Sequence, residues 1–372
     1  MHPPGSADGP EPSALSRRGF LQRSSTLGAA LLSGAGLAAA AAPERPTSPA
    51  TGSACRPVPG LKAGGTVAVI APASPATGKA QQVSAWLLAR SFVPRLFPSA
   101  MVRTDDYLAG TDTLRLEDLH AAFADPTIDA ILCLRGGYGS GRLLDRIDFD
   151  LLSRNPKPFV GYSDITALLV AIMQHAGFVV FHGPMLAPDL LPNKAELTET
   201  ALFTMLQEPQ MAGSWLPHPS GFPLETIRAG TADGRLVGGN LAMIGSTLGS
   251  RYEIELDNAI LFIEDVSETP QKIDRLLTQL RLAGKLAKLK GVLIGDFSEI
   301  NDPHANEDRT AANLQRLLMV WRDLLEPLEI PILAGWRSGH CSPNLTLPIG
   351  ARIHLDASNK RMRLEQQVIR GS

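Results

Sequence analysis

The chain has 372 residues, of which 44% are hydrophobic, so it can bury a sizeable core and has room for two domains. Its 35 basic residues nearly balance its 37 acidic ones, which argues against nucleic acid or an anionic membrane surface as a partner. Three cysteines, with no CxxC pair and no HExxH motif, exclude a disulfide framework and argue against a zinc site.

The N-terminal 42 residues predict an export signal. Arg17 and Arg18 precede a weakly apolar run of small residues over 27–42, a pattern typical of a twin-arginine signal peptide. The run is marginal as a membrane span, and a retained N-terminal anchor is the alternative. Residues 43–60 are rich in proline and predict a flexible linker. We therefore expect a periplasmic or otherwise exported protein that starts near Leu61 and is not inserted in a membrane after processing.

The remaining chain alternates short apolar runs with segments of helical periodicity. Buried strands are predicted at 66–71, 129–134, 158–160, 259–263 and 291–295. Helices are predicted at 79–91, 113–124, 165–175 and 272–283. This alternation predicts an α/β fold with a parallel sheet. We expect an N-terminal α/β domain over 61–187, an irregular proline-rich connection over 188–235, and a C-terminal β/α domain over 236–365.

Ser163 is the first candidate for chemistry. It lies in the sequence Gly-Tyr-Ser-Asp at 161–164, between a predicted strand and an apolar helix. A serine at such a turn can present its hydroxyl as a nucleophile, beside free N–H groups that would stabilise an oxyanion. Helix N-capping is the alternative role for a serine at this position.

A glycine-rich segment, Arg-Gly-Gly-Tyr-Gly at 135–139, follows another predicted strand. Glycines at a strand end allow close approach of a ligand and present N–H donors. The spacing is neither that of a dinucleotide fingerprint nor that of a P-loop, so a plain turn is the alternative interpretation.

Glu264 and His340 form the third candidate. Glu264 ends the apolar strand at 259–263, where its carboxylate could orient an imidazole that accepts a proton from a serine. Of the eight histidines, His340 and His182 are the two candidates for that base.

Taken together, these segments resemble the LD-carboxypeptidase family of serine peptidases, which includes murein tetrapeptide carboxypeptidases and microcin-immunity proteins. The resemblance runs from about residue 64 to 355. It is carried by motifs at 107–112 (YLAGTD), 135–139 (RGGYG), 161–166 (GYSDIT), 182–185 (HGPM), 238–241 (GGNL), 264–266 (EDV), 339–340 (GH) and 347–350 (LPIG).

The resemblance implies an N-terminal flavodoxin-like domain, with a parallel sheet, that bears the serine, and a C-terminal mixed β/α domain. It implies Ser163 as nucleophile, Glu264 as orienting acid and His340 as base, with an oxyanion hole formed by the backbone N–H groups of Gly137 and Asp164. The resemblance also implies a homodimer and an enzyme that needs no metal or organic cofactor. The substrate it implies is a muropeptide, from which the enzyme would release terminal D-alanine. The alternatives are a microcin-immunity-like hydrolase of peptidyl or acyl nucleotides and a non-catalytic muropeptide-binding protein.

Overall fold

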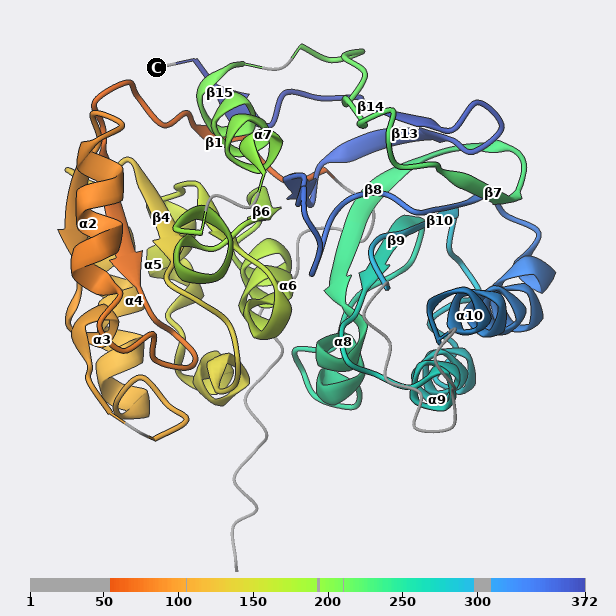
Figure 1. Ribbon diagram of the computed structural model, residues 1–372, viewed down its shortest axis with the longest axis horizontal. Coiled ribbons are helices and arrows are strands. Elements are labelled where there is room, and N and C mark those ends of the chain that lie inside the picture. The colour runs from red at the N-terminus through yellow and green to blue at the C-terminus, as the bar shows by residue number, and fades with distance from the viewer. Residues whose placement is uncertain (1–53, 105, 193–194, 210, 298–308, 372) are drawn as a thin grey trace, which may run out of the picture. The chain divides into compact units, whose positions relative to one another are not determined.

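The computed structural model describes residues 54–104, 106–192, 195–209, 211–297 and 309–371, and its two main sheets lie side by side (Figure 1). Both sheets belong to one compact unit, and one hydrophobic cluster includes strands of both. The expected export signal over 1–42 lies outside the described residues. Among those residues, no helix has the length and apolar character needed to cross a bilayer.

The first sheet has the flavodoxin-like strand order that the family resemblance implies. Its parallel strands run β3-β2-β4-β5-β6, which is the order 2-1-3-4-5 along the chain. These strands are β2 (Thr66–Ile70), β3 (Val93–Leu96), β4 (Ala130–Cys133), β5 (Phe159–Gly161) and β6 (Val180–His182). A strand from late in the chain, β12 (Leu347–Ile349), pairs antiparallel with β6 and closes that edge. The C-terminal segment is thereby joined to the sheet that carries Ser163.

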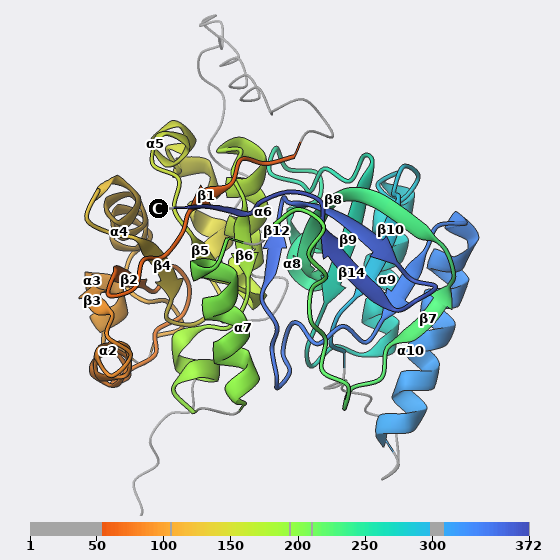
Figure 2. The same ribbon diagram turned by 90° about the horizontal axis from the view of Figure 1, so that it is seen from above.

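Helices cover both faces of this sheet, which is why its central strands are continuous apolar runs. One face carries α4 (Asp112–Ala124), α5 (Phe149–Arg154) and α6 (Thr166–His175), and the other carries α2 (Ala80–Leu88) and α7 (Glu196–Gln207) (Figure 2). Helix α6 is buried over Thr166–Gln174 because it also packs against the second half of the protein. The short elements α3 (Pro98–Met101), η1 (Ser140–Arg146), η2 (Ser163–Ile165) and η3 (Leu186–Leu190) complete this half.

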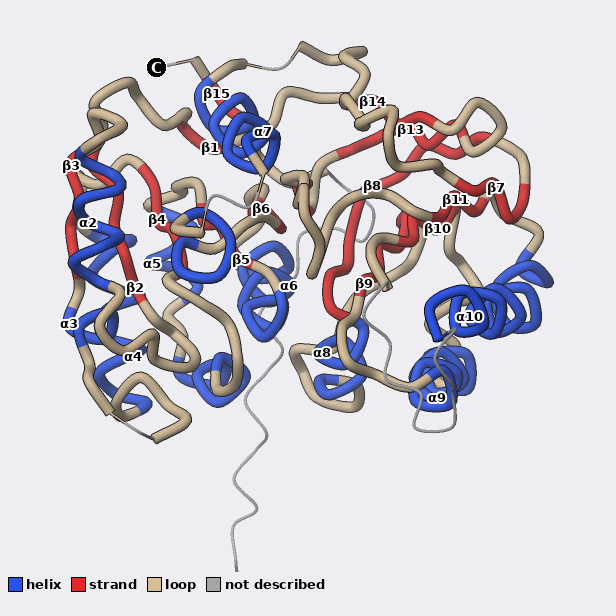
Figure 3. Tube along the Cα trace, in the orientation of Figure 1, coloured by secondary structure: helices blue, strands red, loops and turns tan. Residues whose placement is uncertain are grey.

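The second sheet is mixed, as expected for the C-terminal half. Its order is β14-β13-β8-β9-β10-β11-β7, with β8 to β11 parallel and the outer strands antiparallel. The strands are β7 (Glu225–Arg228), β8 (Thr231–Asn240), β9 (Ala259–Glu264), β10 (Gly291–Ile294), β11 (Ile332–Ala334), β13 (Arg352–Asp356) and β14 (Arg361–Leu364). Helices α8 (Leu241–Thr247), α9 (Pro270–Leu282) and α10 (Arg309–Leu325) lie side by side along it, and η4 (Glu326–Leu328) follows α10 (Figure 3).

Two sequence expectations about connecting segments are wrong. The described part of the expected linker, from residue 54 to 60, is packed: β1 (Val58–Pro59) pairs with β15 (Ile369–Arg370), and Cys55 and Val58 are buried. The expected irregular connection over 188–235 contains α7, β7 and the start of β8. Pro59 stands in a two-stranded pair, where its missing N–H costs no ladder hydrogen bond, and Pro188 lies within the short η3.

Close packing between the halves explains the Gly-Gly-Asn motif at 238–240. A Cβ atom on Gly239 would lie 2.7 Å from the Thr166 side chain, at the start of α6. The next residue, Asn240, donates its N–H to Thr166 Oγ1 at 3.0 Å. The end of β8 is thus fixed against the helix that follows Ser163, and β9, which ends at Glu264, is paired beside it.

Candidate active site

Ser163 occupies a strained turn between β5 and α6. Its φ is +61°, in the left-handed region, which costs a non-glycine residue about 1–3 kcal/mol. The preceding Gly161 has no room for a side chain, because its Cβ would lie 2.8 Å from Ile165 Cγ2. Tight turns of this kind present a nucleophile above the carboxyl end of a sheet. The Ser163 side chain is half-buried and caps no backbone N–H, so the helix N-cap alternative is not what the structure has.

The glycine-rich segment after β4 lies directly against this turn. A Cβ on Gly136 would lie 3.1 Å from Ser163 Cβ, and a Cβ on Gly137 would lie 2.4 Å from Ser74 Oγ. Gly137 also has a φ of +105°, so both its space and its backbone require glycine. The Ser74 hydroxyl accepts the N–H of Tyr138 at 3.1 Å and donates to the carbonyl of Tyr107 at 2.7 Å, which holds the segment in place.

Asp164 joins the glycine-rich segment to the serine turn. Its buried carboxylate accepts the N–H of Ser140 at 2.8 Å and that of Gly139 at 3.3 Å. Within the described chain, the N–H groups of Gly137 and Asp164 have no hydrogen-bond acceptor. Both are therefore free to donate to a ligand, and their role as oxyanion donors stays a prediction from the family resemblance.

Glu264 and His340 form a hydrogen-bonded pair. Glu264 is fully buried at the end of β9, and its Oε2 lies 2.7 Å from His340 Nδ1. The approach depends on Gly339, whose φ is +119° and whose Cβ would lie 2.6 Å from the same oxygen. A side chain at Gly339 would therefore displace the carboxylate or the histidine.

The contact between Glu264 and His340 shifts the pKa of each group. Burial alone would raise the pKa of Glu264, but the neighbouring imidazoles of His182 and His340 outweigh it and hold that pKa at about 2. Burial would lower the pKa of His340, but its hydrogen bond to the Glu264 carboxylate raises that pKa above its ordinary value of 6.5. The carboxylate is thus ionised near neutral pH and stabilises a protonated His340.

His182, the competing candidate for the base, lies on the other side of Glu264. It is fully buried, with its Nε2 3.7 Å from Glu264 Oε1 and its Nδ1 3.3 Å from Ser338 Oγ. Its ring packs edge-on against Phe262. Since His182 does not line the pocket that holds Ser163, the structure favours His340 as the histidine that can reach a substrate.

Sequence reasoning missed the support that Tyr162 gives to His340. The two rings are in edge contact, with centroids 4.8 Å apart. The Tyr162 hydroxyl donates to Asp189 Oδ1 at 3.2 Å, and the other oxygen of Asp189 accepts the N–H of Met185 at 2.9 Å. Tyr162 belongs to the Gly-Tyr-Ser-Asp motif at 161–164, but the sequence indicated a role only for Ser163 and the Asp164 N–H in that motif. Asp189 gave no signal, because it lies in the segment expected to be irregular.

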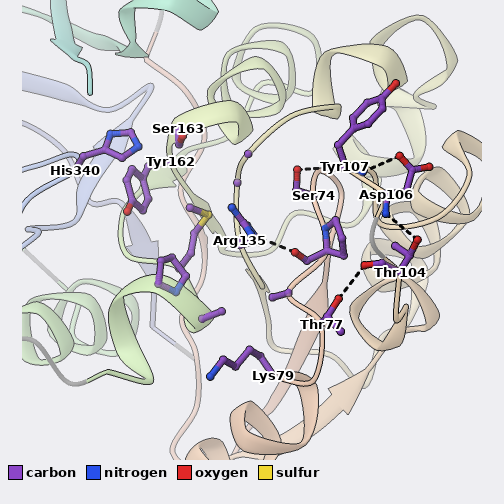
Figure 4. A pocket seen from close by; sticks show the side chains of 17 residues that line it. Ser74, Thr77, Lys79, Thr104, Asp106, Tyr107, Arg135, Tyr162, Ser163 and His340 are labelled. Atoms are coloured by element: carbon purple, nitrogen blue, oxygen red, sulfur yellow. Dashed lines mark hydrogen bonds between the residues drawn. The ribbon is translucent and has the colours of Figure 1, made fainter. Parts of the chain in front are cut away.

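Ser163 and His340 line the same pocket, which has a volume of about 770 Å³ (Figure 4). In the described chain no hydrogen bond joins Ser163 to His340, so the pair shares the pocket without a direct bond. The other lining residues come from the N-terminal half: Ser74, Pro75, Ala76, Thr77, Lys79, Thr104, Asp106, Tyr107, Arg135, Gly136, Gly137, Tyr162, Met185, Ala187 and Pro188.

One described group has the spacing of metal ligands, on the second sheet. Atoms of Asp233, His354 and Glu365 lie within 4.8 Å of one another. His354 Nδ1 already lies 2.9 Å from Asp233 Oδ1, and Arg363 lies 2.6 Å from Glu365. These contacts explain the group as surface ion pairs, and none of its members lines the pocket. The three cysteines are free thiols.

Comparison with known proteins gives matches to both halves of the chain. The profile of the LD-carboxypeptidase N-terminal domain matches residues 67–183, and that of the LD-carboxypeptidase C-terminal domain matches residues 233–355. The probable murein peptide carboxypeptidase of Bacillus subtilis is 39% identical over 313 residues, which cover 84% of this chain and 95% of that protein.

Solved structures are similar over the same range. Muramoyltetrapeptide carboxypeptidase from Oxalobacter formigenes superposes with a TM-score of 0.67 at 29% identity, covering 80% of this chain and 97% of that one. MccF in complex with glutamyl sulfamoyl guanosine superposes with a TM-score of 0.72 at 26% identity, covering 84% and 99%. The profile matches include Ser163 in the first domain and Glu264 and His340 in the second.

Proposed function

Because the chain belongs to the LD-carboxypeptidase family, we propose that it is a serine carboxypeptidase that hydrolyses an L,D-amide bond and releases terminal D-alanine from peptidoglycan tetrapeptides. The observation that carries this proposal is the shared pocket: Ser163 and the Glu264-bound His340 both line it, so one bound substrate can contact both. A reactive serine needs a base, and the base needs an orienting acid.

In the proposed acylation step, Ser163 Oγ attacks the carbonyl carbon of the scissile amide while His340 Nε2 accepts the hydroxyl proton. Glu264 holds the Nδ1–H of His340, which fixes the ring and stabilises its positive charge. The N–H groups of Gly137 and Asp164 bind the oxyanion of the tetrahedral intermediate. The amine then leaves with the proton from His340, and Ser163 is left as an acyl ester.

Hydrolysis of the ester repeats these roles with water as nucleophile. His340 accepts a proton from the water, the oxyanion forms in the same place, and Ser163 regains its proton as the acid product leaves. Each step uses only this chain's own residues.

A defined substrate tests the proposed reaction. Purified protein incubated with a muropeptide tetrapeptide should convert it to the tripeptide and free D-alanine, read by mass, and Ser163→Ala should not. A peptidyl-sulfamoyl nucleotide run in parallel tests the microcin-immunity-like alternative. Binding of the tetrapeptide without turnover by the folded wild-type protein would instead support a non-catalytic muropeptide-binding protein.

We also propose that the protein is exported, on the basis of Arg17-Arg18 and the apolar run at 27–42. Replacing both arginines by lysine should trap the precursor inside the cell, since the export receptor reads that pair. Unchanged export of the lysine variant would contradict twin-arginine routing. A homodimer, proposed from the family resemblance, is tested by light scattering of the mature protein.

A further inference from the structure

Arg135 is a cationic side chain inside the candidate active site. It lies two residues beyond the end of β4, its side chain is exposed, and it lines the pocket together with Ser163 and His340. Its Nη1 donates to the carbonyl oxygen of Pro75 at 3.3 Å. Its Nη2 lies 3.6 Å from the point where a Cβ of Gly137 would stand, so the guanidinium lies beside the proposed oxyanion donor. Figure 4 shows it in view between Ser163 and Ser74.

The charge of Arg135 is not neutralised by the described part of the chain. No described carboxylate forms an ion pair with it, whereas the next arginine, Arg142, lies 2.9 Å from Asp112. Asp106, the carboxylate that lines the same pocket, accepts the N–H of its neighbour Tyr107 at 2.7 Å. Apart from the bond to Pro75, the N–H donors of Arg135 have no partner among the described residues. A guanidinium whose N–H donors are free can bind a carboxylate by donating two parallel hydrogen bonds to its oxygens.

A carboxypeptidase must distinguish the end of a chain from its interior, and the carboxylate is the feature that differs. In a terminal amino acid this group is two bonds from the scissile nitrogen, so its partner must lie close to the reacting carbonyl. Arg135 meets that condition because it neighbours Gly137, whereas the second pocket cation, Lys79, donates instead to Gln82 Oε1 on α2 at 3.4 Å.

We propose that Arg135 binds the terminal carboxylate of the substrate and so confines the enzyme to chain ends. This inference rests on the proposed carboxypeptidase function. It assigns Arg135 a role in specificity, separate from the serine, the glutamate and the histidine.

Matched peptides test the proposal: one tetrapeptide with a free C-terminal carboxylate and the same peptide as a C-terminal amide. For the wild-type enzyme, kcat/KM should be about 100-fold higher for the acid, the range expected for one charge-assisted two-bond contact. In Arg135→Met that ratio should fall toward one, and Arg135→Lys should restore part of it. Lys79→Met, the matched control, should keep the wild-type ratio. An unchanged ratio in Arg135→Met, or no preference in the wild type, would overturn the proposal.

Binding separates this proposal from the proposed reaction. Calorimetry on Ser163→Ala should show the acid binding at least about 10-fold more tightly than the amide, and Ser163→Ala/Arg135→Met should lose that difference. This result would support the carboxylate site even if the wild-type enzyme hydrolysed neither peptide. Equal binding of both peptides, or binding of neither, by a folded Ser163→Ala protein would overturn it. Circular dichroism of each variant verifies folding.

Discussion

Asp164 and Ser140 are bonded twice: Asp164 Oδ2 accepts the Ser140 N–H at 2.8 Å, and the Asp164 carbonyl accepts the Ser140 hydroxyl at 2.5 Å. These two bonds join the turn that carries Ser163 to the segment that carries Gly137. The proposed oxyanion donors, Gly137 and Asp164, are far apart in the sequence. The bonds between Asp164 and Ser140 fix the position of one donor relative to the other.

Asp164→Ala should damage this positioning. It leaves the buried N–H groups of Gly139 and Ser140 without their acceptor, which should lower the free energy of unfolding by about 2 kcal/mol. We expect kcat to fall about 10- to 100-fold and KM to change little, because the oxyanion forms only during reaction. Steady-state kinetics and urea unfolding measure both effects. Asp145→Ala, which replaces an exposed aspartate of η1, is the control, and equal behaviour of the two variants would contradict this role.

The glycine segment allows a matched steric comparison. Gly137→Ala places a methyl group 2.4 Å from Ser74 Oγ on a backbone with φ of +105°, so it should shift the proposed oxyanion donor and lower kcat by about 100- to 1,000-fold. Gly141→Ala, a few residues on, meets nothing within 4 Å and should keep near wild-type kcat. Similar kcat values for both variants would show that the Gly137 N–H is not used.

Substitutions of Ser163, His340 and Glu264 should lower kcat by different amounts, and their effects should not add. Ser163→Ala and His340→Ala should each lower kcat at least about 1,000-fold, and the double variant should lose little more than either, because residues that act as one unit fail together. Glu264→Gln should cost less than either single change. Kinetics of the four proteins on the muropeptide measure the pattern.

His182→Ala is the control for the assignment of the base. His182 is fully buried beside Phe262 and Ser338, so its loss should lower the free energy of unfolding by about 1–3 kcal/mol while kcat falls modestly. A folded His340→Ala enzyme with near-normal kcat, together with a folded but inactive His182→Ala enzyme, would move the base to His182.

The pH dependence should follow His340. As a base it must be neutral, and its bond to Glu264 raises its pKa, so kcat/KM should increase with pH through a midpoint above 6.5. Glu264→Gln removes the negative charge that favours the protonated ring, which should move the midpoint to lower pH. The activity profile measures the first effect, and an NMR titration of the His340 ring measures both. A midpoint that Glu264→Gln leaves in place would contradict the coupling.

The sequence predicted the parts of the fold that are local. Strands such as 66–71 and 129–134 are continuous apolar runs, and glycine segments mark where β4 and β5 end. It did not predict β1 against β15 or β12 against β6, because these pairs join residues far apart in the chain and each strand is only two or three residues long. Helix α7 was not predicted, because the prolines near it indicated an irregular segment.

The candidate site divides in the same way. Ser163, Glu264 and His340 stood at recognisable ends of strands and in motifs, and the family resemblance joined them. The placement of His182 behind Glu264, and the support of His340 by Tyr162 and Asp189, depend on tertiary packing that no local pattern encodes.

The central claim, that Ser163 is a nucleophile activated by His340, is tested most directly by labelling with a fluorophosphonate and locating the adduct by peptide mass. The account predicts one adduct, on Ser163, that forms at a rate greatly reduced in His340→Ala and is absent from Ser163→Ala. An enzyme that cleaves the tetrapeptide while Ser163 stays unlabelled, or that is labelled equally fast without His340, would contradict it.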